Sequence, residues 1–179
     1  PVVTATSETS ILYMVPVMAN VDEFGRYSSA ASSTDQGLEF ELVQESGEWR
    51  ISGAPDGIVL SEPAFREAFS SYRLYYFSSG YRDLVADVRW FASRGEVSTK
   101  IVRSLLEEPS FWLNQGATVS AFPEGSQLAL TPIPVTDGVA QVDLTTSVLS
   151  ANEVTRARML LQLSASLSQV QGISSARLS

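Results

Sequence analysis

Residues 72–77 (YRLYYF) open the half of the chain that decides the fold. Aromatic and apolar side chains in such a short run favour a β-strand. Further along, Ser93 and Glu96 have the spacing of a capping box, which predicts the start of a helix. Apolar residues at three- and four-residue spacing then indicate a single buried stripe, and Pro109 ends the helix. The stripe consists of Val97, Ile101, Val102, Leu105 and Leu106.

The rest of this half completes the pattern of a small domain. Residues 128–135 and 139–144 are predicted to be strands, and Asp137 and Gly138 between them are a hairpin signal. Asn152 is a predicted N-cap of a long helix, and Gly172 suits the left-handed position after it. Residues 175–178 then return as a strand. The apolar side predicted for the long helix is Ala157, Leu160, Leu161, Ser164, Leu167 and Val170.

The sequence of the first third of the chain indicates strands and no long helix. Residues 11–21, 38–44 and 48–51 alternate or run apolar as strands do, with a turn at Ser46 and Gly47. Residues 20–33 are turn-like, and residues 1–10 fit either a frayed start or an edge strand. A few strands alone leave an apolar face uncovered. We therefore expect residues 1–52 to be the end of a larger α+β sheet or to pack on the next domain of the chain.

Charge divides the chain at the same place as the pattern of elements. Residues 1–62 contain two basic and ten acidic side chains, whereas residues 63–179 contain ten of each, so the net charge of −8 lies in the first third. This break predicts a domain boundary near Glu62, where a short helix-forming stretch begins at Pro63. A net acidic chain is poorly suited to nucleic acid or to anionic lipid, and neither is a predicted partner.

Composition argues against catalysis. The chain has no Cys and no His, which excludes thiol nucleophiles, disulfides, zinc sites built on thiolate or imidazole, and Ser-His-Asp triads. Phosphate-binding glycine loops and calcium loops are also missing from the sequence. Four carboxylates are predicted to lie apart at the surface. They are Glu107, Glu108, Asp137 and Asp143.

A serine and lysine pair on the first long helix has the wrong order for catalysis. Lys100 precedes Ser104 by four residues, whereas the helical Ser–Lys dyad places the serine three residues before the lysine, where this chain has Val97. We expect both side chains on a solvated helix face. The sequence therefore predicts a non-enzyme, with no catalytic residue, no cofactor and no metal site.

Large aromatic residues flank that helix in regions that look like loops. Such residues can anchor a protein partner, or can pack within the core or against the first domain. Arginines nearby form a basic region, which could hold the acidic first third or meet an acidic partner. The predicted partner-binding residues are Arg89, Trp90, Phe91, Arg94, Phe111 and Trp112.

Seven segments together resemble one family. They are residues 47–51 (GEWRI), 55–60 (PDGIVL), 75–77 (YYF), 105–113 (LLEEPSFWL), 121–125 (AFPEG), 138–144 (GVAQVDL) and 168–172 (SQVQG). In this order they are similar to the actinobacterial LpqB lipoprotein family, and the second half resembles its GerMN domain. The chain departs from the pattern at Glu108, where many members have glycine.

This resemblance implies a fold and a domain order. We expect an α+β fold, in which a small GerMN-type α/β sandwich comes after a partial antiparallel sheet of cystatin-like or NTF2-like type. The expected domains are residues 1–62 and 63–179. Because the chain begins at Pro1 without an export segment, we expect it to be a piece of a longer protein. Members of the family carry an upstream lipidated cysteine and a C-terminal β-propeller.

The resemblance also implies a function. Family members are tethered to the outer face of the cytoplasmic membrane and are associated with the MtrA–MtrB two-component system. The chain is therefore expected to be a non-catalytic accessory fragment that binds the extracellular region of an MtrB-like sensor histidine kinase and modulates signalling. The β-propeller of the full-length protein is a further expected partner. The alternative is a cell-envelope module that binds peptidoglycan or lipid in a deep apolar pocket of the first domain.

Overall fold

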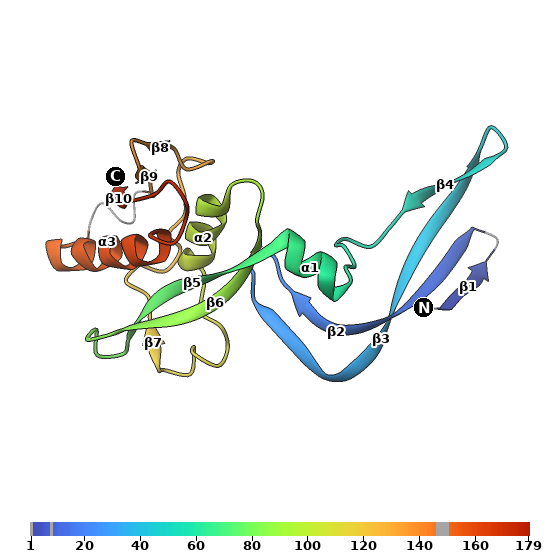
Figure 1. The fold of residues 1–179 in the computed structure, drawn as a ribbon, viewed down its shortest axis with the longest axis horizontal. Helices are drawn as coiled ribbons and strands as arrows, with labels where there is room; N and C mark the ends of the chain where they lie inside the picture. Colours follow the sequence, from blue (N-terminus) through green and yellow to red (C-terminus); the bar gives the residue numbers. More distant parts are fainter. Residues whose placement is uncertain (1, 8, 146–150) are drawn as a thin grey trace. The chain divides into compact units, whose positions relative to one another are not determined.

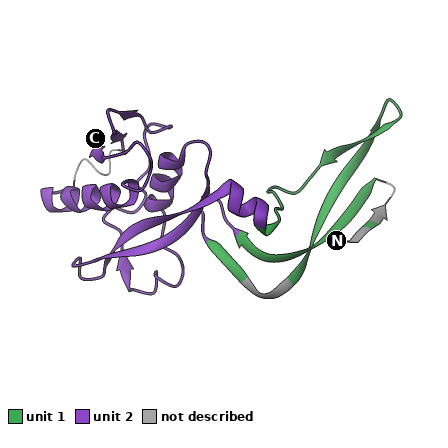
Figure 2. Ribbon diagram, viewed as in Figure 1, with its two compact units in different colours: residues 1–20, 27–62 green, residues 21–26, 63–179 purple. Residues whose placement is uncertain are grey.

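A computed structural model describes residues 2–7, 9–145 and 151–179. The chain folds into two compact units (Figures 1 and 2). Unit 1 comprises Pro1–Asn20 and Tyr27–Glu62, and unit 2 comprises Val21–Arg26 and Pro63–Ser179. Sheets and packed helices make the fold α+β, as the sequence predicts. No helix within the described ranges is long and apolar enough to cross a membrane.

Unit 1 is built on a four-stranded sheet in the order β1-β2-β3-β4. Its strands are β1 (Val2–Ser7), β2 (Ser10–Val21), β3 (Tyr27–Glu45) and β4 (Glu48–Gly53). Ser46 and Gly47 connect β3 to β4 with φ of 53° and 85°, a geometry that suits tight hairpins, and the predicted turn is confirmed. The start of the chain is an edge strand. The turn-like prediction for residues 20–33 is wrong beyond Arg26, because β3 begins at Tyr27.

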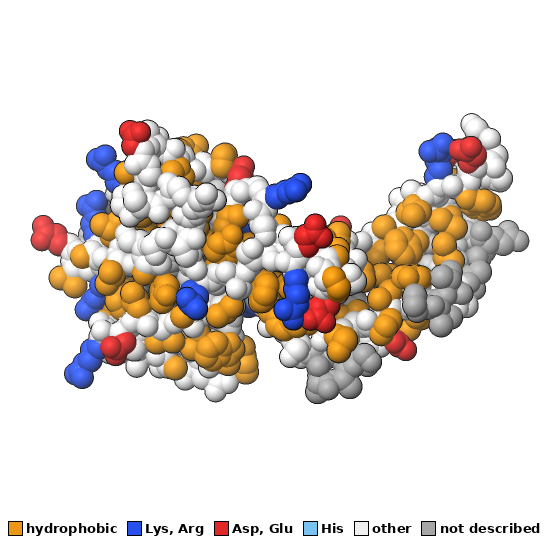
Figure 3. Space-filling model, in the orientation of Figure 1, with side chains coloured by type: hydrophobic (Ala, Val, Ile, Leu, Met, Phe, Trp, Pro, Cys, Tyr) orange, Lys and Arg blue, Asp and Glu red, His pale blue; other side chains and the backbone are white. Residues whose placement is uncertain are grey.

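The sheet of unit 1 leaves apolar side chains in solvent. Leu42 lies opposite Ile51 and Gln44 lies opposite Trp49, so these four side chains share one face. Trp49 and Ile51 are 55% and 62% exposed. None of the side chains described in unit 1 is buried. Figure 3 shows hydrophobic side chains gathered over this unit. A sheet with an apolar face normally packs against a second layer, which the described part of unit 1 does not contain.

The described residues of unit 2 form three helices and two small sheets, ordered β6-β5-β7 and β10-β9-β8. Helices α2 and α3 lie beside the long β5–β6 hairpin (Figure 1), and α3 packs on both β5 and β10. The elements are α1 (Glu62–Ala68), β5 (Phe69–Ser78), β6 (Leu84–Ala92), α2 (Val97–Leu106), β7 (Thr118–Val119), β8 (Val135–Thr136), β9 (Val139–Val142), α3 (Glu153–Leu167) and β10 (Ser175–Leu178). Their apolar faces form a single core that includes Leu74, Tyr76, Ile101, Leu105, Met159, Leu163 and Leu167.

Two local predictions for unit 2 are wrong. Helix α2 begins at Val97 with Glu96 as N-cap, and no capping hydrogen bond from that side chain occurs among the described residues. Ser93 is engaged elsewhere, because its backbone N–H donates to the Ala68 carbonyl. Residues 128–135 are not a strand, apart from Val135 in β8 and one bridge between Leu128 and Leu144. Prolines 132 and 134 lack the N–H that a ladder needs.

The buried face of α3 is polar in part and differs from the predicted one. Leu160 and Leu161 are 38% and 51% exposed, while Gln162 and Ser166 are buried. The Gln162 side-chain oxygen accepts from the Ala121 N–H at 2.8 Å, and the Ser166 hydroxyl oxygen accepts from the Tyr75 N–H at 3.0 Å. These polar groups face inward because backbone donors there need partners. The predicted cap is confirmed, since the Asn152 side chain accepts from the Thr155 N–H at 2.9 Å.

The orientation of α3 gives a direct mutational test. Leu163→Ala opens a cavity in the core and should lower the free energy of unfolding by about 2–5 kcal/mol. Leu161→Ala removes the same atoms from the exposed face and should change the free energy of unfolding by less than about 0.5 kcal/mol. Urea denaturation of both variants measures the difference. Equal losses would contradict an orientation in which Leu163 is buried and Leu161 is exposed.

Candidate partner-binding turn

The six predicted binding residues do not form one surface. Trp90 and Phe91 lie in strand β6, not in a loop. Phe91 is 3% exposed and Arg89 is fully buried, so the prediction that these two side chains face a partner is wrong. Trp90 is half-buried and packs on Phe65, with ring centroids 5.1 Å apart. Arg94 is exposed in the bend before α2.

Phe111 and Trp112 have a different environment. They lie in the turn after α2, and their side chains are 81% and 64% exposed. On either side of the pair, Ser110 and Leu113 are buried. Residues 110–114, named the aromatic turn, therefore present two large aromatic side chains between two anchored residues.

Strand β6 supplies the anchor through a buried ion pair. Asp87 and Arg89 are two residues apart, so their side chains lie on the same face of the strand. The Arg89 Nε and one terminal nitrogen donate to the same Asp87 oxygen at 3.0 and 2.7 Å. Both residues are almost completely buried. A buried pair of this kind is stable only when its remaining hydrogen-bonding groups are also satisfied.

Arg89 satisfies its remaining groups on backbone carbonyls. One terminal nitrogen donates to the Phe24 carbonyl at 3.0 Å, and the other donates to the Glu108 carbonyl at 3.3 Å. Arg26 donates to the same Glu108 carbonyl at 2.7 Å. The segment Val21–Arg26 is therefore held in unit 2 by its own Arg26 and by Arg89 of β6.

Gly25 is required where that segment crosses β6. Its carbonyl accepts from the Trp90 N–H at 2.8 Å, and its φ is 75°. A Cβ atom added at Gly25 would lie 2.7 Å from the Phe91 ring and 2.8 Å from the Trp90 carbonyl oxygen. Both the positive φ and the close approach exclude a larger residue.

Asp87 fixes the aromatic turn directly. One of its oxygens accepts from the Ser110 N–H at 2.8 Å, and the other accepts from the Ser110 hydroxyl at 2.8 Å. The Ser110 carbonyl in turn accepts from the N–H groups of Leu113 and Asn114. The Asn114 amide donates to the Glu108 carboxylate at 2.8 Å. The turn is thus held at both ends, and its aromatic side chains can bind a partner at low entropic cost.

A buried tyrosine lies near this network. The Tyr76 hydroxyl donates to the Ser104 carbonyl at 3.0 Å, and Ser104 itself is buried, so the prediction that it lies on a solvated face is wrong. Burial raises the pKa of the Tyr76 phenol well above its usual range, although the nearby Arg89 charge opposes the shift. The phenol therefore remains a hydrogen-bond donor at any physiological pH.

Two of the predicted surface carboxylates have structural roles in turns. The Glu108 side chain accepts from Asn114, and Asp137 occupies the β8–β9 turn with φ of 51°. No group of three His, Cys, Asp or Glu residues close enough to hold a metal occurs in the ranges that the structure describes.

Sequence reasoning missed the residues that hold the aromatic turn. Asp87 and Ser110 were not singled out, although opposite charges at i and i+2 in an otherwise apolar strand indicate a buried pair. No local signal connects Ser110 to Asp87, because the two residues are far apart in sequence and meet only in the folded unit.

Comparison with known proteins identifies two domain models. A model described as the N-terminal domain of lipoprotein LpqB matches residues 1–66, and the Germane model, described as sporulation and spore germination, matches residues 73–179. A solved structure with tandem GerMN domains, from the sporulation protein GerM of Bacillus subtilis, is 12% identical. It has a TM-score of 0.48, and the match covers 62% of this chain and 38% of that one.

Curated relatives carry the name Lipoprotein LpqB. The protein from Bifidobacterium longum is 29% identical over 152 residues, which cover 84% of this chain and 26% of the relative. The protein from Cutibacterium acnes is 26% identical over 159 residues, which cover 84% of this chain and 27% of the relative. The chain thus spans about a quarter of the length of these relatives.

Removing Asp87 should destabilise unit 2 and loosen the aromatic turn. In Asp87→Ala the Arg89 charge stays buried without its partner, so we expect a loss of about 3–5 kcal/mol in the free energy of unfolding. Glu107→Ala removes an exposed carboxylate and should cost less than about 0.5 kcal/mol. Denaturation measures both, and hydrogen exchange at Leu113 and Asn114 should accelerate in Asp87→Ala. Unchanged exchange would show that Asp87 does not hold the turn.

Tyr76 should make stability fall at high pH. The phenol loses its proton near pH 10 in the unfolded chain, whereas burial keeps it protonated in the folded chain. The contribution of the protonated Tyr76 phenol to the free energy of unfolding is therefore complete below about pH 10. Above that pH it declines, by at most about 1.4 kcal/mol per pH unit. The free energy of unfolding, measured from pH 8 to about 11, should fall more steeply for the wild-type chain than for Tyr76→Phe. Parallel curves would contradict this expectation.

Proposed function

Because this chain belongs to the Germane family, in the domain order of the LpqB lipoproteins, we propose that it is a non-catalytic, protein-binding part of a longer lipoprotein. The relatives are named lipoproteins, which supports an upstream lipid anchor in the full-length protein. We propose that this anchor places the chain at the outer face of the cytoplasmic membrane. Residues 1–62 and 63–179 would act as separate domains, except that the segment Val21–Arg26 belongs to the second unit. The proposed partner is the extracellular region of an MtrB-like sensor histidine kinase, whose signalling the chain modulates.

The observation that supports protein binding is the aromatic turn. Phe111 and Trp112 are highly exposed, yet Ser110 before them is bonded to Asp87 of the buried ion pair, and the N–H groups of Leu113 and Asn114 after them donate to the Ser110 carbonyl. Exposed aromatic residues on a rigid support are typical of the residues that dominate binding energy at protein interfaces. In the full-length lipoprotein the C-terminal β-propeller would be a second surface that this turn can contact.

The alternative function, binding of peptidoglycan or lipid, has less support. It requires a deep apolar pocket in the first domain, whereas the side chains described in unit 1 include none that is buried. Two cavities of about 250 and 320 Å³ both belong to unit 2. The larger one is lined by charged residues of both signs, among them Asp22, Lys100 and Arg103, which suits a lipid chain poorly.

Binding of the kinase region tests the proposal. A calorimetric titration of this chain with the purified extracellular domain of the sensor kinase should show saturable binding. Trp112→Ala should weaken it at least about tenfold, because a central aromatic anchor contributes about 2 kcal/mol or more. Trp49→Ala is the matched control, since Trp49 is 55% exposed but lies in unit 1.

Each outcome is informative provided that both variants unfold like the wild-type chain. Binding lost only in Trp112→Ala supports contact through the aromatic turn. Equal affinity in all three forms would move the contact to another surface, and no binding by the wild-type chain would reject this partner for this part of the protein.

A further inference from the structure

Strand β10 has a free backbone edge. Among the residues that the structure describes it pairs only with β9, in parallel, and it is the outer strand of its sheet. The Ser175 N–H donates to the Gly138 carbonyl and the Ser179 N–H donates to the Val142 carbonyl, both toward β9. Because backbone groups alternate along a strand, those of Ala176 and Leu178 point away from β9. Neither residue has a hydrogen bond on that side to any part of the chain that the structure describes.

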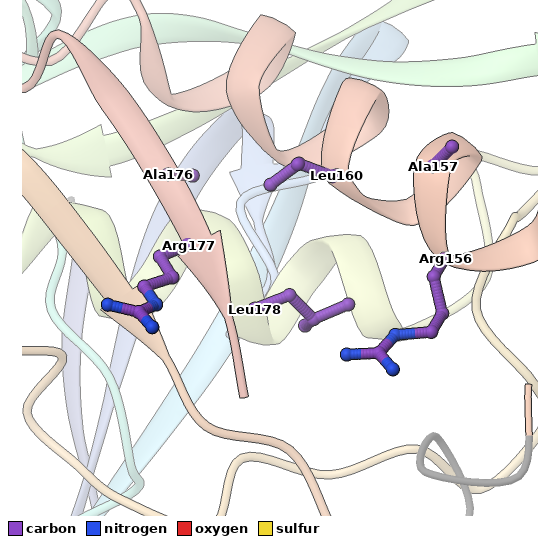
Figure 4. Close-up of a pocket in the computed structure, with 6 residues that line it drawn as sticks. All are labelled: Arg156, Ala157, Leu160, Ala176, Arg177 and Leu178. Carbon is purple, nitrogen blue, oxygen red and sulfur yellow. The ribbon is translucent and has the colours of Figure 1, made fainter. Parts of the chain in front are cut away.

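A groove runs between this edge and helix α3. It has a volume of about 250 Å³ and is lined by Arg156, Ala157 and Leu160 of α3 and by Ala176, Arg177 and Leu178 of β10. Figure 4 shows Leu178 between the guanidinium groups of Arg156 and Arg177, with Leu160 above it on the helix. The groove therefore combines an apolar floor with a positive charge from each element.

The two arginines are available for a partner. Both are exposed, and neither forms an ion pair with any described residue. This differs from Arg89 and Arg26, whose guanidinium groups are engaged within unit 2. Paired cations beside an unpaired strand edge select an acidic segment in extended conformation.

We propose that β10 and α3 form a second binding site, which takes an acidic, extended segment of another protein as an added strand. The incoming backbone bonds to Ala176 and Leu178, its apolar side chains contact Leu160, and its carboxylates pair with Arg156 and Arg177. A second copy of this chain fits poorly, because pairing β10 with β10 would bring like charges of Arg177 together. The site is separate from the aromatic turn and does not depend on the kinase as partner.

An NMR titration of this chain with a synthetic peptide tests the proposal. The probe is the acetylated and amidated peptide Ser-Glu-Val-Asp-Val-Glu-Ser, and its control replaces each acid by the corresponding amide. We expect the acidic peptide to shift the backbone amides of Ala176 and Leu178 and to bind at least about fivefold more tightly than the amide control at low salt. Inorganic phosphate should leave those two backbone amides unchanged.

Two kinds of variant separate charge from backbone pairing. The double variant Arg156→Gln and Arg177→Gln should weaken binding of the acidic peptide about fivefold, given the modest strength of exposed ion pairs. Arg103→Gln, which removes an exposed charge on α2, should not change the affinity. Ala176→Pro removes one free N–H without breaking the pairing to β9, and it should reduce binding of both peptides.

The results that would overturn the proposal are distinct. Absence of shifts at residues 175–179 up to about 1 mM peptide would reject the site. If inorganic phosphate reproduces the shifts, the site binds anions in general and the added strand is rejected. If the free chain dimerises through β10, the edge is occupied by a second copy of the chain and not by an acidic segment. If Ala176→Pro does not fold, the arginine variants alone decide the outcome.

Discussion

The buried ion pair between Asp87 and Arg89 is the interaction on which unit 2 depends. Two charges removed from water are tolerated only when the nitrogen and oxygen atoms of the pair have hydrogen-bond partners. The structure meets this condition with groups from separate segments, which include the carbonyl of Phe24, the carbonyl of Glu108, and the N–H and hydroxyl of Ser110. Because the buried charges of Asp87 and Arg89 in β6 need these partners, the ion pair fixes the position of the aromatic turn, which carries Phe111 and Trp112.

The two units are stabilised in different ways. In unit 2, apolar faces meet in one core, and no buried side-chain nitrogen or oxygen among the described residues lacks a hydrogen bond. In unit 1, the described side chains are at most half-buried, and cross-strand pairs such as Leu42 with Ile51 remain open to solvent. Since burial of apolar area is the main source of stability, most of the free energy of unfolding belongs to unit 2. Both proposed binding surfaces are on the unit that can hold them rigid.

Two features of unit 2 combine rigidity with exposure. The aromatic turn exposes side chains while its backbone is bonded, whereas the β10 edge exposes backbone groups while its side chains Ala176 and Leu178 pack against the core. The first arrangement suits a partner with a complementary pocket, and the second suits an extended segment.

The sequence by itself determined the features that depend on neighbouring residues. The hairpin turn at Ser46 and Gly47, the Asn152 cap and strand β10 result from local backbone preferences, and all three were predicted. The segment pattern also indicated the LpqB and GerMN resemblance, which the family models confirm. Features that depend on distant partners were missed or misassigned.

Only the tertiary structure decided which side of α3 is buried and which arginines are available. Gln162 faces inward because the Ala121 N–H, far away in sequence, needs an acceptor, so hydrophobicity along the helix does not show its buried side. Arg89 is buried and Arg177 is exposed, although both occur in strands of mixed sequence. The burial of a charge depends on whether its hydrogen-bonding partners come together in space, and that is a property of the whole fold.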